Sequence, residues 1–213
     1  MLAKQLYNIP QAVATVDDLR DQGKWADLYQ INAAIDTAFA AATFEGNDAA
    51  TAERVQDQLA LHMCVRELPP NRPTALRLLQ IPGATPGSCL ACADPACKGN
   101  RVDDLGDGSF RVVFEHHKTR TRIQEAIRIP VAANTVTAVL LHDYVQRRRP
   151  LLVKTDTRAL FLNKRGDAFS EYSFGEYVPR LLNQLGLGSL SYTTVSALRG
   201  RRRPPPAPHP PLW

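Results

Sequence analysis

A short basic segment between two strand-like stretches is the part of this sequence best suited to chemistry. The stretch before it, residues 110–114, is β-branched and aromatic, and the stretch after it, residues 125–131, alternates apolar and polar side chains around a proline, as an edge strand does. Between them lie three cations, Lys118, Arg120 and Arg122. Lysine offers a phosphate a point charge, and arginine offers it a bidentate fork. The pattern predicts a β-hairpin with a phosphate-binding tip, and the alternative is an ordinary solvated turn.

Three cysteines form a second candidate site, because Cys89, Cys92 and Cys97 follow the spacing C-x2-C-x4-C. Thiolates bind zinc, and a tetrahedral site needs one further donor. That donor has three candidates: Cys64, His116 and His117. The spacing differs from that of the common zinc knuckle, so plain loop cysteines are the alternative. The sequence therefore leaves structural zinc open and requires no other cofactor.

The charge of the chain is unevenly distributed along its length. The 213 residues have a formal net charge of +5, yet residues 1–60 carry 4 basic and 9 acidic side chains, while the remainder carries 22 basic and 12 acidic ones. Nucleic acid is the commonest polyanion that meets such a surface. We therefore expect the second part of the chain to contact nucleic acid, which the resemblance described below narrows to double-stranded DNA; the alternative is a basic protein that binds none.

The overall composition is that of a globular protein. A hydrophobic content of 44% can fill a core, and no apolar run approaches the length of a membrane span. The first residues lack the apolar core of a signal peptide, and four cysteines without such a signal favour a reducing compartment. We expect a nuclear or otherwise intracellular protein that is not secreted and does not contact a membrane.

Periodic apolar residues predict a mainly helical chain. Helices are expected over residues 16–20, 24–44, 49–67, 74–81, 131–148 and 170–185. Three polar residues are placed as N-caps: Thr15, Asp48 and Ser170. Pro150 is expected to end the fifth helix, where the cations at residues 147–149 suit the helix dipole. With a third strand near residue 102, the predicted fold class is mainly α with a small three-stranded antiparallel β-sheet, an α+β fold.

Three parts are expected along the chain. Residues 1–48 form an N-terminal helical segment, and residues 49–199 form the core. Residues 200–213 hold six of the sixteen prolines, together with three arginines. Such a composition predicts a disordered or polyproline-like tail.

Four short motifs follow one another along the chain, and their order is more specific than any one of them. They are a Pro-Pro-x-Arg turn at residues 69–72, the segment CKGNR at 97–101, HHKT at 116–119, and Leu-Phe-x-Asn-x-x-Gly at 160–166. This order resembles the catalytic domain of tyrosine recombinases, the phage-integrase superfamily, and within it crypton-type transposon recombinases and related algal proteins. The likeness covers roughly residues 50–199.

The resemblance implies that DNA strands are broken and rejoined through a tyrosine that attacks a phosphodiester. In the family, two arginines clamp the phosphate and a lysine protonates the leaving oxygen. By position, these residues are Arg72, Arg199 and Lys118. Four further residues are expected to contact DNA: Arg101, His117, Arg120 and Arg122. Self-association on the DNA would also be in keeping with the family.

Two departures from the family pattern concern catalysis. Ser196 stands where the family has a histidine, and no tyrosine follows Arg199. The last tyrosine is Tyr192, which is expected to be accessible, whereas Tyr172 and Tyr177 are assigned to helix packing. Because a covalent mechanism needs its nucleophile, the sequence predicts an inactive, C-terminally truncated recombinase domain of a mobile element. A damaged copy and a shifted reading frame are alternative causes.

Two other hypotheses belong to different classes. One is a zinc-stabilised interaction module without a nucleic-acid role, built around the three cysteines. The other is a fragment that does not fold stably, because the missing terminal helices would leave apolar core surface uncovered.

Overall fold

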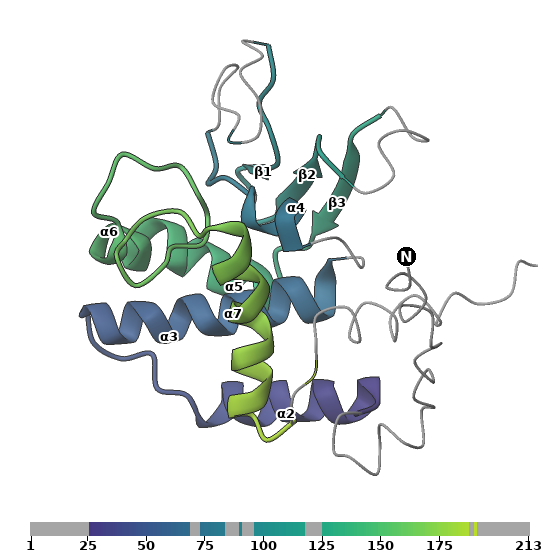
Figure 1. Ribbon diagram of the computed structural model, residues 1–213, viewed down its shortest axis with the longest axis vertical. Coiled ribbons are helices and arrows are strands. Elements are labelled where there is room, and N and C mark those ends of the chain that lie inside the picture. Colours follow the sequence, from purple (N-terminus) through teal and green to yellow (C-terminus); the bar gives the residue numbers. More distant parts are fainter. Residues whose placement is uncertain are drawn as a thin grey trace, which may run out of the picture.

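The sheet lies at one end of the molecule, and the helices form the rest (Figure 1). The structure is a computed structural model, and it describes residues 26–68, 73–83, 90, 96–117, 125–187 and 190. The helical elements are α2 (Leu28–Ala41), α3 (Ala49–Ala60), η1 (Leu61–Glu67), α4 (Pro73–Arg77), α5 (Val136–Asp143), η2 (Tyr144–Arg148), α6 (Arg149–Leu152) and α7 (Glu171–Gln184). The strands are β1 (Arg101–Asp104), β2 (Phe110–Phe114) and β3 (Ile127–Val131). The mixed α+β class is confirmed.

The three strands form one antiparallel sheet in the order β1-β2-β3. The central strand β2 has the bounds that the sequence predicts, and Phe110, Val112 and Phe114 on it are buried. Pro130 lies on the edge strand β3, where a residue without an amide hydrogen removes no bond from the middle of the sheet. The predicted strand pairing around the basic connection is therefore confirmed.

Polar caps set the starts of four helices among the described residues. Asp48 accepts a hydrogen bond from Thr51 N at 2.7 Å, and Ser170 accepts one from Ser173 N at 3.1 Å, as predicted. Two further caps were not predicted: Asp27 and Thr135. The helix expected over residues 24–44 is consequently shorter, because the capping box at Asp27 starts it at Leu28.

The helix predicted over residues 49–67 is present as α3 followed directly by the π-helical segment η1. Its predicted apolar face is buried throughout, from Val55 and Leu59 to Met63 and Leu68. The same core contains Ile31 and Ile35 of α2. The N-terminal helix therefore packs with the remainder of the described chain.

The prediction of one helix over residues 131–148 is wrong at both ends. Val131 belongs to β3, and α5 begins only after Thr135. The helical chain then runs through η2 into α6 and passes Pro150. Pro150 falls in the first turn of α6, where the absent amide hydrogen is not needed.

The predicted apolar face of this helix is only half right. Leu140 and Tyr144 are buried, but Val139 is 62% exposed and Val136 is also exposed. The sequence placed these four and Val145 on one face, but the two exposed valines lie on α5, before η2 begins at Tyr144. Only the part of the stripe that meets α3 is covered.

Two of the three arginines at residues 147–149 are buried, whereas the sequence assigned the run to the helix dipole alone. The Arg148 side chain is 4% exposed; it pairs with Asp143 Oδ2 at 2.8 Å and donates to the carbonyls of Phe44 and Gly46. Arg149 donates to Ala159 O at 3.0 Å and to Thr157 O. Both guanidinium groups therefore hold loops against the helices, and burial lowers the pKa of Arg149.

A buried glutamine on α3 joins three parts of the chain. Gln56 Nε2 donates to Leu162 O at 2.9 Å, and Leu162 N donates to Gln56 Oε1 at 2.8 Å. The Tyr144 hydroxyl on η2 also donates to Gln56 Oε1. The extended apolar stretch predicted at residues 160–163 is thus present, held to the helices by a side chain in place of a neighbouring strand.

The stretch around Gln80 connects this helical part to the sheet. Gln80 N donates to Asn100 O, and Val102 N donates to Gln80 O, both at 3.0 Å. On the other side, Leu160 N donates to Leu79 O at 2.7 Å. The sheet is therefore fixed to the helices by backbone bonds. In the part of the chain that the structure describes, no helix combines the length and the apolar composition that crossing a bilayer requires.

Candidate nucleic-acid interface

The predicted site residues divide into two groups. Seven lie outside the described residues: Arg72, Cys89, Cys92, Lys118, Arg120, Arg122 and Arg199. Three are described: Cys97, Arg101 and His117. Cys97 precedes β1, Arg101 is the first residue of β1, and His117 lies in the connection after β2. The described residues around these positions therefore show how the predicted site is supported.

One buried asparagine ties two of the predicted motifs together. The Asn100 side chain is part of the CKGNR segment, and the residue is 1% exposed. Its Nδ2 donates to Ala75 O in α4 at 2.9 Å and to His116 O at 3.0 Å, and its Oδ1 accepts from His116 N at 2.7 Å. Asn100 thus pairs with the backbone of His116 as a neighbouring strand would. The start of α4 and the end of β2 are held against the same side chain.

His117 closes the base of the β2–β3 connection. Its Nε2 lies 3.2 Å from Glu125 O, and because a carbonyl only accepts hydrogen bonds, Nε2 is the donor. The residue is 8% exposed. His117 therefore holds the two ends of the basic connection together, which is a structural task that the sequence did not assign to it.

Arg101 is already engaged by the protein. Its guanidinium pairs with Asp103 at 3.0 Å and Glu115 at 3.2 Å, and it donates to Gly99 O. The side chain is only 12% exposed. Arg101 can reach a DNA phosphate only by giving up these partners, and its visible task is to brace the sheet end.

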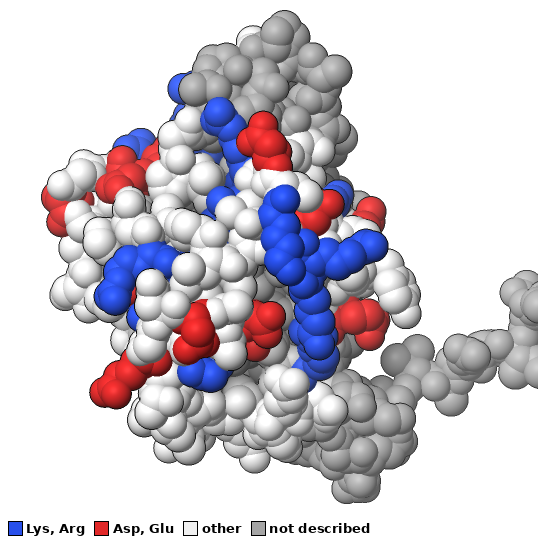
Figure 2. Space-filling model, turned by 90° about the vertical axis from the view of Figure 1, so that its left-hand side faces the viewer, with Lys and Arg blue, Asp and Glu red and all other residues white. Residues whose placement is uncertain are grey.

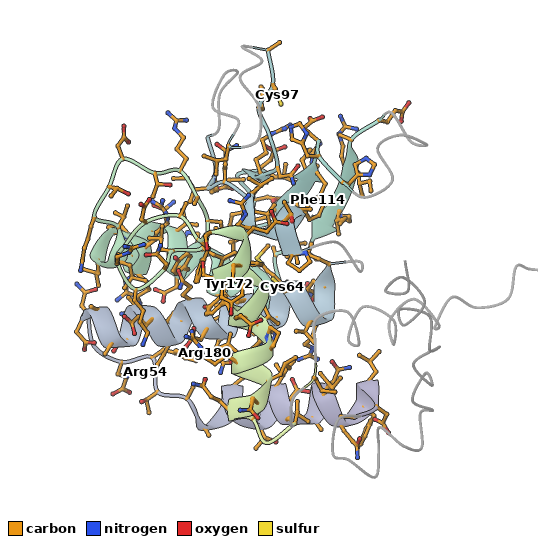
Figure 3. All side chains as sticks on the ribbon, in the orientation of Figure 1. Arg54, Cys64, Cys97, Phe114, Tyr172 and Arg180 are labelled. Atoms are coloured by element: carbon orange, nitrogen blue, oxygen red, sulfur yellow. The ribbon has the colours of Figure 1, made fainter. Side chains whose placement is uncertain are left out.

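The third cysteine of the predicted metal site lies beside a histidine. Cys97 Sγ is 3.4 Å from His116 Nε2. Cys64, another candidate ligand, is 2% exposed in η1 within the helical part, whereas Cys97 lies at the sheet end (Figure 3). Within the described ranges, no group of three or more His, Cys, Asp and Glu side chains is arranged to hold a metal ion.

A separate cleft of about 660 Å³ lies among α3, α7 and the turn after Leu162. It is lined by four cations: Lys154, Lys164, Arg165 and Arg180. Three acids also line it: Glu53, Asp57 and Asp167. Figure 2 shows a band of Lys and Arg on the face drawn there, with Asp and Glu beside it. Because three acids line the cleft together with the four cations, a phosphate there would also meet negative charge.

Two buried groups at the cleft perturb each other. The Tyr177 hydroxyl donates to Asp57 Oδ1 at 2.7 Å. Burial raises the pKa of Asp57, although the Tyr177 bond acts against that shift. Burial, together with the Asp57 charge, raises the pKa of Tyr177 well above its usual value. Tyr177 is therefore a protonated donor and is unsuited to act as a nucleophile.

The tyrosines differ in access. Tyr177 is 2% exposed, in agreement with the packing role expected from the sequence. Tyr172 is 81% exposed in the first turn of α7, so the packing role expected for it is wrong (Figure 3). Tyr172 comes before the first buried residue of α7. Phe174 and Tyr177 make the buried contact of the helix, and the Tyr172 side chain points to solvent. Tyr192 lies outside the described residues.

Asn100 and Gln56 are the two site-supporting residues that sequence reasoning missed. Asn100 stood inside a motif that was recognised, but only Arg101 was given a task. A polar residue directly before a strand and after a turn glycine is the signal that could have indicated a buried bridge. Nothing in the sequence indicated that Gln56 is a buried bridge, because a polar residue at this position is ordinary in an amphipathic helix.

Comparison with known proteins adds no relative. No protein-family model, curated protein or solved structure matches this chain.

Proposed function

We propose that this chain is a DNA-binding domain of tyrosine-recombinase type, in which Arg72, Lys118 and Arg199 approach one DNA phosphate. The observation that carries the proposal is the Asn100 bridge. Arg72 is bonded directly to Pro73, the first residue of α4, and Lys118 is bonded directly to His117. Since Asn100 binds both Ala75 and His116, the two chain segments that lead to these cations start from one place.

This arrangement supports phosphate binding on physical grounds. A phosphate is held well by an arginine fork and a lysine point charge that are positioned before it arrives. The sheet, α4 and the buried Asn100 provide a rigid base, and His117 fixes the ends of the connection that carries Lys118, Arg120 and Arg122. The basic surplus beyond residue 60 favours the same ligand.

The first test is the salt dependence of binding to duplex DNA. We expect log K to fall linearly with log salt, because each neutralised phosphate releases counterions. Lys118→Ala is expected to weaken binding roughly tenfold or more, similarly for every sequence, and to make the slope shallower by about 1. Titrations at several salt concentrations measure both quantities.

The matched control for this titration is Arg147→Ala. Its side chain is 65% exposed and pairs with Asp143, on the helical part of the molecule. This variant is expected to bind DNA as the unaltered chain does. Absence of binding at low salt, or equal losses in both variants, would argue against the proposal.

The second test concerns catalysis. We expect the 213-residue chain to form no covalent adduct with a nicked suicide DNA substrate. Tyr144 and Tyr177 are buried and burial raises the pKa of each, so neither supplies a phenolate to DNA. Denaturing electrophoresis, with protease digestion to identify any shifted band, makes the measurement. A covalent band lost in Tyr172→Phe or Tyr192→Phe would instead reveal a rewired enzyme.

The competing function is a zinc-stabilised interaction module. The short distance between Cys97 Sγ and His116 Nε2 favours a metal at the sheet end. A metal at this place would not conflict with DNA binding. Zinc content together with no DNA affinity at low salt would favour this second function.

A further inference from the structure

We propose that Cys97 Sγ and His116 Nε2 are two ligands of one zinc ion, which fastens the approach to β1 to the end of β2. This inference is independent of the DNA-binding proposal. It chooses among the donors that the sequence left open, and it rests on the geometry of the described pair.

The separation of the two donor atoms fits a shared metal. In a tetrahedral site with usual zinc–sulfur and zinc–nitrogen distances, a thiolate and an imidazole nitrogen lie about 3.6 Å apart. The observed distance from Cys97 Sγ to His116 Nε2 is 3.4 Å. The observed separation is therefore within a few tenths of an ångström of the separation that a shared zinc ion would impose.

The sulfur also receives a backbone hydrogen bond. Gly99 N donates to Cys97 Sγ at 3.3 Å, and Gly99 reaches this position with φ of 70°, a conformation that suits glycine. An amide hydrogen directed at sulfur stabilises a thiolate, and such partners commonly surround metal ligands. The Cys-x-Gly turn thus prepares the sulfur to bear negative charge.

The histidine is held in place from behind. Asn100 pairs with both the N–H and the C=O of His116, at 2.7 and 3.0 Å. Asn100 is itself anchored to Ala75 O and is almost completely buried. The imidazole therefore starts from a fixed backbone, as a metal ligand requires.

The other histidine and the fourth cysteine are less suitable. His117 Nε2 is used by Glu125 O, and Cys64 is enclosed in the helical core away from Cys97 (Figure 3). The remaining two positions of the tetrahedron call for soft donors. Cys89 and Cys92 lie outside the described residues, so the proposal assigns only Cys97 and His116.

The test measures metal in the purified full chain. We expect one zinc per chain by elemental analysis, falling to near none in Cys97→Ser and in His116→Ala. His142→Ala, which changes an exposed histidine on α5, is the matched control and is expected to keep its zinc.

Cobalt substitution keeps the proposal testable where a variant folds poorly. Cobalt in the unaltered chain is expected to show tetrahedral visible bands and a thiolate charge-transfer band. His116→Cys is expected to retain the metal with a stronger charge-transfer band, because cysteine is an equally good ligand. Circular dichroism checks that each variant is folded.

Three outcomes would overturn the proposal. The first is a chain that contains no zinc and binds none when zinc is added. The second is zinc retained in folded His116→Ala, which would place the metal on cysteines alone. The third is a metal-free Cys97 thiol with unusually rapid alkylation that slows in His116→Ala, which would make the pair an activated thiol instead.

Discussion

Gly166→Ala is expected to destabilise the folded chain by roughly 3–5 kcal/mol, a large part of the stability of an ordinary domain. Gly166 has φ of 75°, and a Cβ built there lies 2.3 Å from Leu152 O and 2.8 Å from Lys154 N. The left-handed backbone alone costs about 1–2 kcal/mol for alanine. The contact with backbone atoms adds more, because neither chain segment can rotate away. Denaturant unfolding followed by circular dichroism measures the change.

Two other glycines separate the causes. Gly186 also has φ of 75°, but nothing lies within 4 Å of its built Cβ, so Gly186→Ala is expected to cost only about 1 kcal/mol. Gly175 is helical and has the same open space, so Gly175→Ala is expected to stabilise the chain by up to about 1 kcal/mol. If Gly166→Ala were no worse than Gly186→Ala, the close approach would be absent in solution.

The importance of Gly166 also explains one motif. The segment Leu-Phe-x-Asn-x-x-Gly at residues 160–166 was noticed for its resemblance, without a physical reason. Leu160 and Phe161 fill the core, while Asn163 Oδ1 accepts from Arg165 N and its Nδ2 donates to Ala168 O. The motif is therefore a buried stretch followed by a turn that needs glycine. It carries structure, and no chemistry has to be assigned to it.

Local chemistry allowed much of the fold to be predicted. The caps at Asp48 and Ser170 and the β2 strand each depend on neighbouring residues, and each was correctly placed. The prediction that Pro150 ends a helix was wrong, because a proline can also begin a new turn and nothing local distinguishes the two. Charge at residues 147–149 was misinterpreted, since the carbonyls that bind Arg148 come from residues about a hundred positions away.

In the candidate site, too, contacts between distant segments were not predicted. Of the predicted site residues, Cys97, Arg101 and His117 are described, and they lie at or next to β1 and β2. The sequence did not predict that Asn100 would join α4 to β2, or that Arg101 would be held by Asp103 and Glu115. Those contacts depend on how separate segments pack, which periodicity does not encode. The partner of Cys97 was left open for the same reason, since Cys64, His116 and His117 have equally suitable donor atoms.

Acid is expected to destabilise this chain through His62. The residue is 2% exposed, and among the described residues its Nε2 has no hydrogen-bond partner. Burial, and after it the charge of Arg66, lower the pKa of His62 from 6.5 to about 4, while Asp36 acts in the opposite direction. The edge-on contact with the Phe39 ring, at 5.4 Å between centroids, offers no acceptor for a proton.

The sign of the effect follows from proton binding. Above pH 6.5 His62 is neutral in both states and contributes nothing to the pH dependence. As the pH falls below 6.5, the unfolded chain takes up a proton that the folded chain excludes, so stability is lost progressively until the folded histidine protonates near pH 4. The loss over this range is expected to reach about 3 kcal/mol.

His62→Leu tests this, because leucine keeps an apolar side chain in the core and cannot bind a proton. Denaturant unfolding is measured at a series of pH values from about 7 to about 4. The free energy of unfolding should depend less on pH in the variant than in the unaltered chain. Carboxyl groups such as Asp57, whose pKa burial raises, titrate in both proteins and cancel in the difference. His142→Gln, on the exposed side of α5, should keep the full slope. Parallel curves for His62→Leu and the unaltered chain would mean that the folded protein accommodates a protonated His62, and that the core around Phe39 is open to water.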